Sequence, residues 1–385
     1  MNIGGMTWII LQLIIGHNLV MPLLLYTIHV CAKKQKDLPE HSKEADYAII
    51  VTAYEQTDLL QQAVNSILNI NYSNYLVYIV ADKCDVSGLI FDDPRVILLR
   101  PETTLGSNTR SHFYAINRFV RKHERLTIID SDNLVDREYL RELNKFFDKG
   151  YEAVQGVRDA KNLNTTYACL DAARDVYYHF YDGKLLFGVG SSATLAGSGM
   201  AFNTKLYRDC LEHLDITGAG FDKVLQFEIV KRGRRIAFAE NALVYDEKTA
   251  KTDQLVMQRA RWINTWFKYF SYGFTLMAKG IKKTNFNQFL FGLILLRPPL
   301  FIFLLLAIAC FSVNLFISPM IAIVWMVGIL FFVAAFLIAL MKTKIDKRIY
   351  SALISIPKFM FFQVLSLTKA SKANKISVAT RHDYN

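Results

Sequence analysis

Cysteine is scarce in this chain of 385 residues, and its cysteines are scattered. The five are Cys31, Cys84, Cys169, Cys210 and Cys310. Their number is odd, and neither a disulfide framework nor a zinc spacing appears. Four histidines, at positions 112, 123, 179 and 213, show no metal-ligand spacing either. These absences favour a catalytic part that faces a reducing cytosol.

No nucleic-acid-binding motif accompanies the net charge of +11. The positive clusters flank apolar runs instead, as membrane topology signals do. They are Lys33-Lys34-Gln35-Lys36, Lys279-Gly280-Ile281-Lys282-Lys283, Lys342-Thr343-Lys344 and Lys347-Arg348. We therefore expect membrane lipids as partners and no nucleic acid.

An apolar run covers residues 7–31, and the first eight residues of the chain carry no charged side chain. The run is long enough to span a bilayer. A cleaved signal peptide, the rival interpretation, would have positive charge before the run and a small-residue cleavage site after it. The lysines come afterwards, which predicts a retained anchor with its N-terminus outside and residue 33 onward in the cytosol.

Residues 288–312 and 318–341 form two further apolar runs. The loop between them lacks Lys and Arg, so the runs predict a cytosolic segment over residues 33–287. Arg297-Pro298-Pro299 interrupts the run over 288–312. Inside a membrane, such a break is tolerated only where protein or water forms hydrogen bonds with the freed backbone groups. We expect a kink there, with a role in lining a substrate path as the alternative.

A fourth apolar stretch covers residues 350–368 but contains Pro357 and Lys358. A fourth span would place the lysines that follow it, Lys369, Lys372 and Lys375, outside. An interfacial helix avoids this and is preferred. The spans are few and lack internal repetition, which argues against a transporter.

Strands alternate with helices between the apolar ends. The predicted strands are Tyr47 to Ala53, Leu76 to Ala81, Val96 to Leu99 and Leu126 to Ile129, with helices over Leu59 to Leu68 and near Ser111 to Val120. This alternation predicts an α/β domain with a parallel sheet, which places ligands at the carboxyl ends of the strands. Tyr54, Asp82, Asp130 and Asp132 fall at such ends.

Asp130 and Asp132 follow directly on a predicted strand. Hard cations take oxygen ligands, and Mg²⁺ is usually held by one or two carboxylates together with substrate phosphates. The pair therefore predicts a metal–diphosphate site. A polar loop that caps the next helix is an equal alternative for this short pattern alone.

Further motifs follow in a fixed order. They are Gly197-Ser198-Gly199-Met200, Phe221-Asp222-Lys223 and Gln258-Arg259-Ala260-Arg261-Trp262. With Asp82 and the acidic pair, the chain over roughly residues 46–270 resembles family 2 inverting glycosyltransferases of the GT-A fold. Within that family it resembles the membrane-bound type that includes cellulose, hyaluronan and poly-N-acetylglucosamine synthases. The Q-x-x-R-W element is the most specific part of the resemblance.

The resemblance implies a role for each matching residue on the donor side. Tyr54 and Asp82 would lie at the nucleotide, with Asp130 nearer the ribose and donor sugar. Asp132 would be the direct ligand of Mg²⁺ or Mn²⁺. The sequence Ala53-Tyr54-Glu55-Gln56 departs from the family pattern, because the amide and acid positions are exchanged.

The resemblance also implies the acceptor side of the reaction. Asp222 would be the general base, although Phe221 stands where the family usually has Glu. Gly197, Ser198 and Gly199 would lie beside the acceptor, and Gln258, Arg259, Arg261 and Trp262 would contact the diphosphate and the acceptor. The alternatives are a helix-capping acid at 222, an ordinary glycine turn, and an interfacial helix whose Trp and Arg meet lipid headgroups.

The residues and the resemblance together predict five segments. These are a transmembrane anchor over 1–32, a cytosolic GT-A domain over 33–270, an interfacial linker over 271–287, two transmembrane helices over 288–341, and an interfacial helix with a tail over 342–385. The expected place is the inner or plasma membrane, as a multi-pass protein.

The expected activity is transfer from a nucleotide-diphosphate sugar, by preference a UDP-sugar, to a polysaccharide or lipid-linked acceptor of the cell envelope. Three spans look too few for a private polymer channel, so a homo-oligomer or an export partner is expected if the product is a polymer. The alternative is a catalytically inactive membrane scaffold that binds nucleotide.

Overall fold

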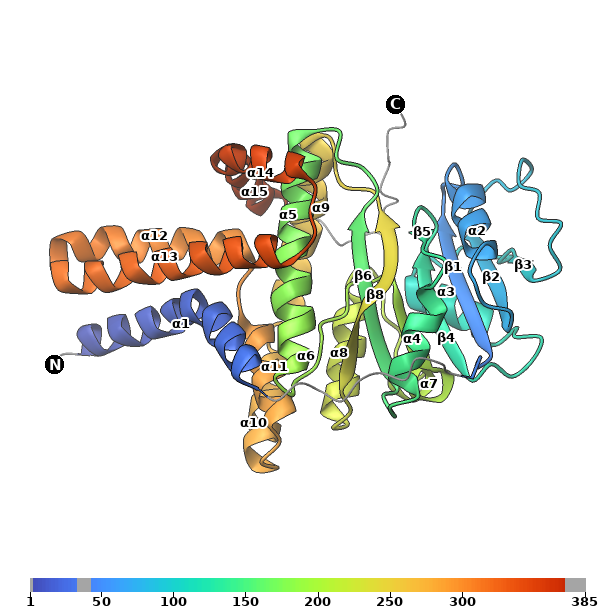
Figure 1. Ribbon diagram of the computed structural model, residues 1–385, viewed down its shortest axis with the longest axis horizontal. Helices are drawn as coiled ribbons and strands as arrows, with labels where there is room; N and C mark the ends of the chain where they lie inside the picture. The colour runs from blue at the N-terminus through green and yellow to red at the C-terminus, as the bar shows by residue number, and fades with distance from the viewer. Residues whose placement is uncertain (1–2, 33–42, 371–385) are drawn as a thin grey trace.

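The computed structural model describes residues 3–32 and 43–370 and has a mixed sheet at its centre (Figure 1). The strands are β1 (Tyr47–Tyr54), β2 (Tyr75–Asp82), β3 (Val96–Leu99), β4 (Arg125–Asp130), β5 (Leu134–Val135), β6 (Ala153–Ala160), β7 (Met200–Asn203) and β8 (Ile236–Asp246). Their order across the sheet is β3-β2-β1-β4-β7-β6-β8-β5. The first four neighbours pair in parallel, and β7 runs antiparallel to β4 and β6.

The predicted α/β architecture is confirmed, and the register explains why the polar strand ends gather. Tyr54 pairs with Asp82, and Thr52 pairs with Asp130. The carboxyl ends of β1, β2 and β4 therefore meet at one edge of the sheet. The central strands are apolar and almost fully buried, as expected of parallel strands covered on both faces.

Helices cover the sheet and form with it the mixed domain, residues 43–282. They are α2 (Leu60–Leu68), α3 (Asn108–Ile116), α4 (Tyr139–Phe147), α5 (Thr166–Tyr178), α6 (Leu186–Gly188), α7 (Thr204–Leu211), α8 (Phe221–Lys231), α9 (Thr252–Tyr269) and α10 (Tyr272–Lys282). A π-helical stretch, η1 (His179–Leu185), continues α5. α2 buries residues at helical spacing, namely Leu60, Ala63, Val64 and Ile67.

The helix expected near Ser111 to Val120 begins earlier and ends sooner than predicted. Ser107 caps it by accepting a hydrogen bond from the backbone N–H of Arg110 at 3.4 Å, which fixes the start at Asn108. The helix ends at Ile116. The apolar pattern did not show this start because the first turn of the helix is polar.

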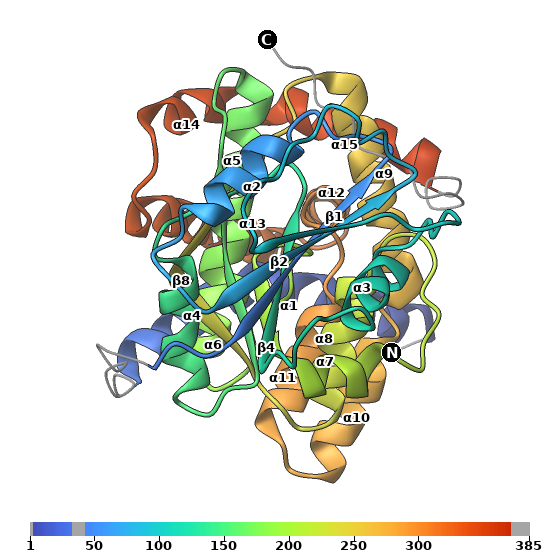
Figure 2. The ribbon, with the colours of Figure 1, turned by 90° about the vertical axis from the view of Figure 1, so that its right-hand side faces the viewer.

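Within residues 3–32 and 43–370, four helical segments are long and apolar enough to cross a membrane: residues 4–31, 300–317, 319–342 and 347–370. The first lies within α1 (Ile3–Cys31), and the next two are α12 (Leu300–Ile317) and α13 (Pro319–Lys342). In Figure 1 these three helices project together from one side of the mixed domain. In Figure 2, α12 and α13 lie behind β1 and β2.

The apolar run over 288–312 is not one continuous helix, and it is interrupted where the sequence indicated a kink. It divides into α11 (Phe286–Leu296) and α12 at the Arg297-Pro298-Pro299 break. Arg297 is extended, at φ −62° and ψ 124°, because a residue before proline is disfavoured in the helical region. Only α12 is long enough to be a candidate span.

The last apolar stretch forms α14 (Lys347–Ala352), a short 3₁₀ turn η2 (Leu353–Ser355) and α15 (Ile356–Ala370). α15 packs against the mixed domain: Asn264 of α9 donates to the Ala370 carbonyl at 2.9 Å, and the rings of Tyr167 and Phe362 meet edge to face. The lysine cluster at 33–36 and the tail after residue 370 lie outside the described residues.

Candidate active site

The acidic pair lies where β4 ends, and the neighbouring chain fixes its backbone. The backbone N–H of Asp130 donates to Ser198 Oγ at 3.1 Å, and Asn133 Nδ2 donates to the same oxygen at 2.7 Å. Ser198 is fully buried. The structure thus uses this serine to hold the turn that carries Asp130 and Asp132.

Asp130 lies in a strongly acidic environment. Burial and the charge of Asp132 raise the pKa of Asp130 to about 6. Asp246 and Asp222 act in the same direction, whereas Arg158 opposes them. Asp132 and Asp222 are therefore both close enough to act on Asp130, although Asp222 is 92 residues away from it in the sequence.

A divalent cation fits this excess of negative charge. Carboxylate oxygens are suitable donors, and a cation would offset the repulsion that now raises the pKa of Asp130. Over residues 3–32 and 43–370, three or more His, Cys, Asp or Glu side chains nowhere gather at metal-binding distance. The remaining ligands would have to come from substrate phosphates or water.

Asp82, at the end of β2, is buried and holds a loop. Its two carboxylate oxygens accept hydrogen bonds from the backbone N–H groups of Leu105 (2.9 Å) and Gly106 (2.8 Å). Tyr54 lies beside it in the register. Glu55, the acid that follows Tyr54, has φ 60° and pairs with Lys83 at 2.7 Å.

The segment 194–199 crosses from the cavity to the acidic pair, and buried amides hold its backbone. Gln155 accepts from the Ala196 N–H at 2.9 Å and donates to the Ser198 carbonyl at 3.1 Å. Gln226 accepts from the Leu195 N–H at 3.0 Å. Gly197 has φ +89°, which only glycine adopts readily, and nothing lies within 4 Å of the Cβ it lacks.

Asp222 lies in the first turn of α8. Lys223 pairs with its carboxylate at 3.0 Å and also donates to the Leu195 carbonyl at 3.1 Å. Gly220 begins the turn at φ +104°. Phe221, which replaces an acid of the family pattern, packs edge to face on the buried His112.

The Q-x-x-R-W residues lie on α9, as predicted, but they differ in exposure. Arg259 is buried and ion-paired with Asp171, and its guanidinium carbon lies 4.0 Å from the centre of the Trp262 ring. Trp262 is 40% exposed, enough to contact a ligand. Gln258 accepts a hydrogen bond from Thr249 at 3.1 Å. Arg261 is partly buried, and burial lowers its pKa.

A chain of ion pairs leads from Arg158, whose charge acts on Asp130, to the side of Trp262. Starting from Arg158, it runs through Asp246, Lys248, Asp175, Arg174 and Asp171 to Arg259. Arg174 also lies over the Trp262 ring, at 4.2 Å from its centre. Oppositely charged neighbours offset the cost of burying each charge.

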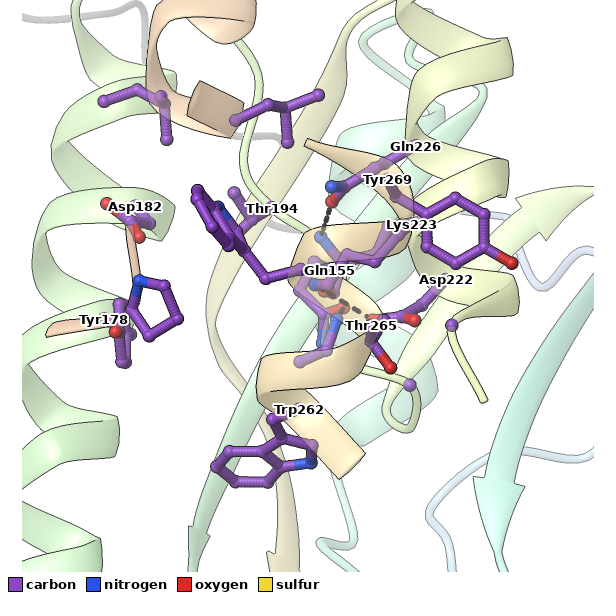
Figure 3. A pocket seen from close by; sticks show the side chains of 18 of the residues that line it. Gln155, Tyr178, Asp182, Thr194, Asp222, Lys223, Gln226, Trp262, Thr265 and Tyr269 are labelled. Atoms are coloured by element: carbon purple, nitrogen blue, oxygen red, sulfur yellow. Dashed lines mark hydrogen bonds and ion pairs between the residues drawn. The ribbon is translucent and has the colours of Figure 1, made fainter. Parts of the chain in front are cut away.

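A cavity of about 460 Å³ lies next to these elements (Figure 3). Tyr178 and Asp182 are on one side, Asp222 and Lys223 are on the other, and Trp262 lies at its lower end in that view. Of the residues predicted for the site, Gly197, Asp222 and Trp262 line it. Among the described residues its lining does not include Tyr54, Asp82, Asp130, Asp132, Ser198, Gly199, Gln258, Arg259 or Arg261.

The structure thus separates the predicted residues into two groups: those at the edge of the sheet, and those at the cavity with α9 beside it. Asp222 belongs to both, because it lines the cavity and its charge acts on Asp130. Sequence reasoning missed three residues that shape the wall between them, Gln155, Arg158 and Gln226. Local patterns gave no signal for them, since their partners lie up to 88 residues away.

A sequence model described as "Glycosyltransferase like family 2" matches residues 45–265, more than half of the chain. The chain therefore belongs to the family 2 glycosyltransferases. A search of the curated proteins finds no match.

Solved structures show the same fold. A mannosyltransferase, PcManGT from Pyrobaculum calidifontis in complex with GDP-Man and Mn²⁺, is 14% identical, with a TM-score of 0.56 over 93% of this chain and 98% of that one. Residues 1–349 of TarS from S. aureus, in complex with UDP-GlcNAc, are 13% identical, with a TM-score of 0.44 over 85% and 90% of the two chains. The family match and the likeness to PcManGT confirm the predicted GT-A fold.

Proposed function

We propose that this protein is an inverting glycosyltransferase that moves a sugar from a nucleotide-diphosphate sugar to an acceptor hydroxyl at the membrane. One observation carries the proposal. Asp132 and Asp222 both lie close enough to Asp130 for their charges to raise its pKa, and Asp222 also lines the cavity. Asp130 and Asp132 suit a diphosphate–metal complex, and Asp222 faces space for an acceptor. Its fold relative PcManGT was solved with GDP-Man and Mn²⁺.

In the proposed reaction, Asp222 takes the proton of the acceptor hydroxyl as its oxygen attacks the anomeric carbon. The bond from that carbon to the diphosphate oxygen breaks on the opposite face, and the electron pair leaves with the nucleotide diphosphate. One displacement by one base gives inversion. Lys223, 3.0 Å from Asp222, holds this carboxylate toward the cavity.

Asp132, with Asp130 beside it, would hold Mg²⁺ or Mn²⁺, which would supply positive charge for the departing diphosphate. Arg261 is proposed to add a second positive charge on the same group. Tyr54 and Asp82 are proposed to border the nucleotide at the edge formed by β1 and β2. Trp262 presents an aromatic face on which an acceptor sugar can stack.

The catalytic domain is proposed to face the cytosol, with α1, α12 and α13 as spans and α15 in the interface. Two features support this orientation. The short turn between α12 and α13 lacks Lys and Arg, and lysines stand on the other side of these helices, at 279, 282, 283 and 342. Packing of α15 on α9 supports an interfacial rather than a spanning position.

The test is a nucleotide-diphosphate release assay on membranes that contain the full chain, with a panel of UDP- and GDP-sugars and with or without Mn²⁺. We expect release from one donor, dependent on the cation, and at least a hundredfold slower in Asp132→Asn and Asp222→Asn. Undiminished turnover in both variants would refute the mechanism. No release from any donor would favour the nucleotide-binding scaffold.

A further inference from the structure

The cavity joins the proposed base to the foot of a candidate membrane span. Asp222 lies on one side, and Asp182 lies on the opposite side (Figure 3). Asp182 is ion-paired with Arg297, so the α11–α12 break is on that opposite side too. Ile294, Leu295, Pro298 and Pro299 line the cavity there, and α12 begins at the very next residue, Leu300.

The walls change in character along the same direction. Around Asp222 they are polar, with Gln155, Lys223 and Gln226. At the break they are apolar through Ile294, Leu295, Pro298 and Pro299, beside the paired charges of Asp182 and Arg297. A ligand that fills the cavity must therefore be polar where it meets Asp222 and largely apolar where it meets the break before α12.

The charges indicate that the polar part of this ligand is neutral. The cations in the lining are Arg158, Arg174, Lys223 and Arg297, and each is already paired with a carboxylate. Burial lowers the pKa of the lining His179 to about 4, so it is uncharged at neutral pH. A phosphate nucleophile would lose its hydration here without gaining an unpaired cation.

Hydroxyl groups suit the same walls better. Asp222 is half-buried and lines the cavity. Trp262 offers a partly exposed ring. A carboxylate acceptor and an aromatic face are groups that bind sugar hydroxyls and sugar rings.

We infer that the acceptor is a glycolipid with an uncharged sugar headgroup. The headgroup lies between Asp222 and Trp262, and the lipid chain leaves past Leu295 and the Pro298-Pro299 break into the bilayer beside α12. This inference rests on the proposed transferase function and names its acceptor class. The group transfer is unchanged: a headgroup hydroxyl loses its proton to Asp222 and receives the donor sugar.

The experiment uses the full chain in phosphatidylcholine nanodiscs with the donor found by the release assay. The acceptor probes are the methyl and dodecyl β-glycosides of glucose, galactose and N-acetylglucosamine, below their micelle concentrations, and dodecyl phosphate. For at least one sugar we expect the dodecyl glycoside to have a KM at least about tenfold lower than its methyl partner, since burial of two methylene groups alone gives a factor of about ten.

Leu295→Gln places a polar group on the path of the chain and should bring the KM of the dodecyl glycoside toward that of the methyl glycoside. The KM of the methyl glycoside should not change. Leu293→Gln is the matched control, because Leu293 is on the same helix, is also partly buried, and is not in the cavity lining. It should keep the chain-length effect.

Equal KM values for methyl and dodecyl glycosides, preference for dodecyl phosphate, or donor consumption without transfer to any glycoside would overturn the inference and leave the transferase function standing. Equal behaviour of Leu295→Gln and Leu293→Gln would also overturn it. If no donor is consumed under any condition, the proposed function itself fails, and the acceptor inference fails with it.

Discussion

Asp130 destabilises the folded protein at neutral pH, because its ionised carboxylate is buried beside other acids. Its pKa is raised to about 6, so between pH 4 and 6 the folded protein binds more protons there than the unfolded chain. The stabilising contribution of this group is therefore fully present below about pH 4 and is lost as the pH rises through 6. A residue that destabilises its own fold at neutral pH indicates a functional demand on that position.

Replacement of this acid should consequently stabilise the cation-free protein. In EDTA, Asp130→Asn should raise the free energy of unfolding at pH 7 by about 3 kcal/mol, and the Tm with it, and should have little effect at pH 4. Differential scanning fluorimetry across this pH range tests the sign. A variant that is less stable than the parent at pH 7 would contradict the assigned repulsion.

Gly220 is the residue whose missing side chain positions Asp222. A Cβ there would lie 2.6 Å from Tyr269 Cε2 and 2.7 Å from Thr265 Cγ2, at a φ of +104°. We expect Gly220→Ala to displace the first turn of α8 and to lower kcat at least about tenfold, with a stability loss of about 2–3 kcal/mol.

Gly233→Ala is the control for Gly220→Ala. It also has positive φ, +77°, but nothing lies within 4 Å of its missing Cβ. Only the conformational cost of about 1–2 kcal/mol should appear, with unchanged kcat. Equal losses of kcat in the two variants would show that contact with α9 is not what positions Asp222.

At the scale of elements, the first four strands, β1 to β4, could be predicted from the sequence, because short apolar runs bounded by polar residues are local signals. The ends of β1, β2 and β4 fall at Tyr54, Asp82 and Asp130. The division of the run over 288–312 was visible only as the Arg297-Pro298-Pro299 interruption. A lining role for that break was only the alternative expectation, and its partner had no sequence signal, because Asp182 pairs with Arg297 across 115 residues.

The ion pairs that join α5 to α9 had no sequence signal either. Asp171 on α5 serves both Arg174 and Arg259, and both guanidiniums lie over the Trp262 ring. Asp171 is thus a positioning residue for Trp262, although it does not line the cavity among the described residues. The family motif identified Trp262 and Arg259, but it did not identify the carboxylate that ties them together.

Asp171→Asn should therefore affect stability and acceptor binding together. Two buried guanidiniums lose their common charge, which costs about 3–5 kcal/mol and lowers the Tm by about 10 °C. In the folded fraction, the KM for the acceptor should rise, while the KM for the donor should not. Asp346→Asn, which removes a surface pair with Arg348, should change neither quantity. A rise in the donor KM alone would contradict the positioning role.

At the scale of the whole molecule, the cavity lies beside the Arg297-Pro298-Pro299 break that leads into α12, so the orientation of α12 and α13 decides which side of a membrane the site faces. The turn between them includes Ser318, and the mixed domain exposes Ser87 in a loop after β2. The lysine distribution predicts that the first of these is outside and the second inside.

Cysteine labelling in intact cells tests this orientation directly. Ser318→Cys should react with a membrane-impermeant maleimide in intact cells, whereas Ser87→Cys should react only after lysis. The parent chain is the control, because Cys31 is exposed at the predicted inner end of α1 and should also stay unlabelled until lysis. Labelling of Ser87→Cys but not of Ser318→Cys in intact cells would show that the orientation is the opposite of the predicted one. The catalytic cavity would then open where nucleotide-sugar donors of the cytosol do not reach it.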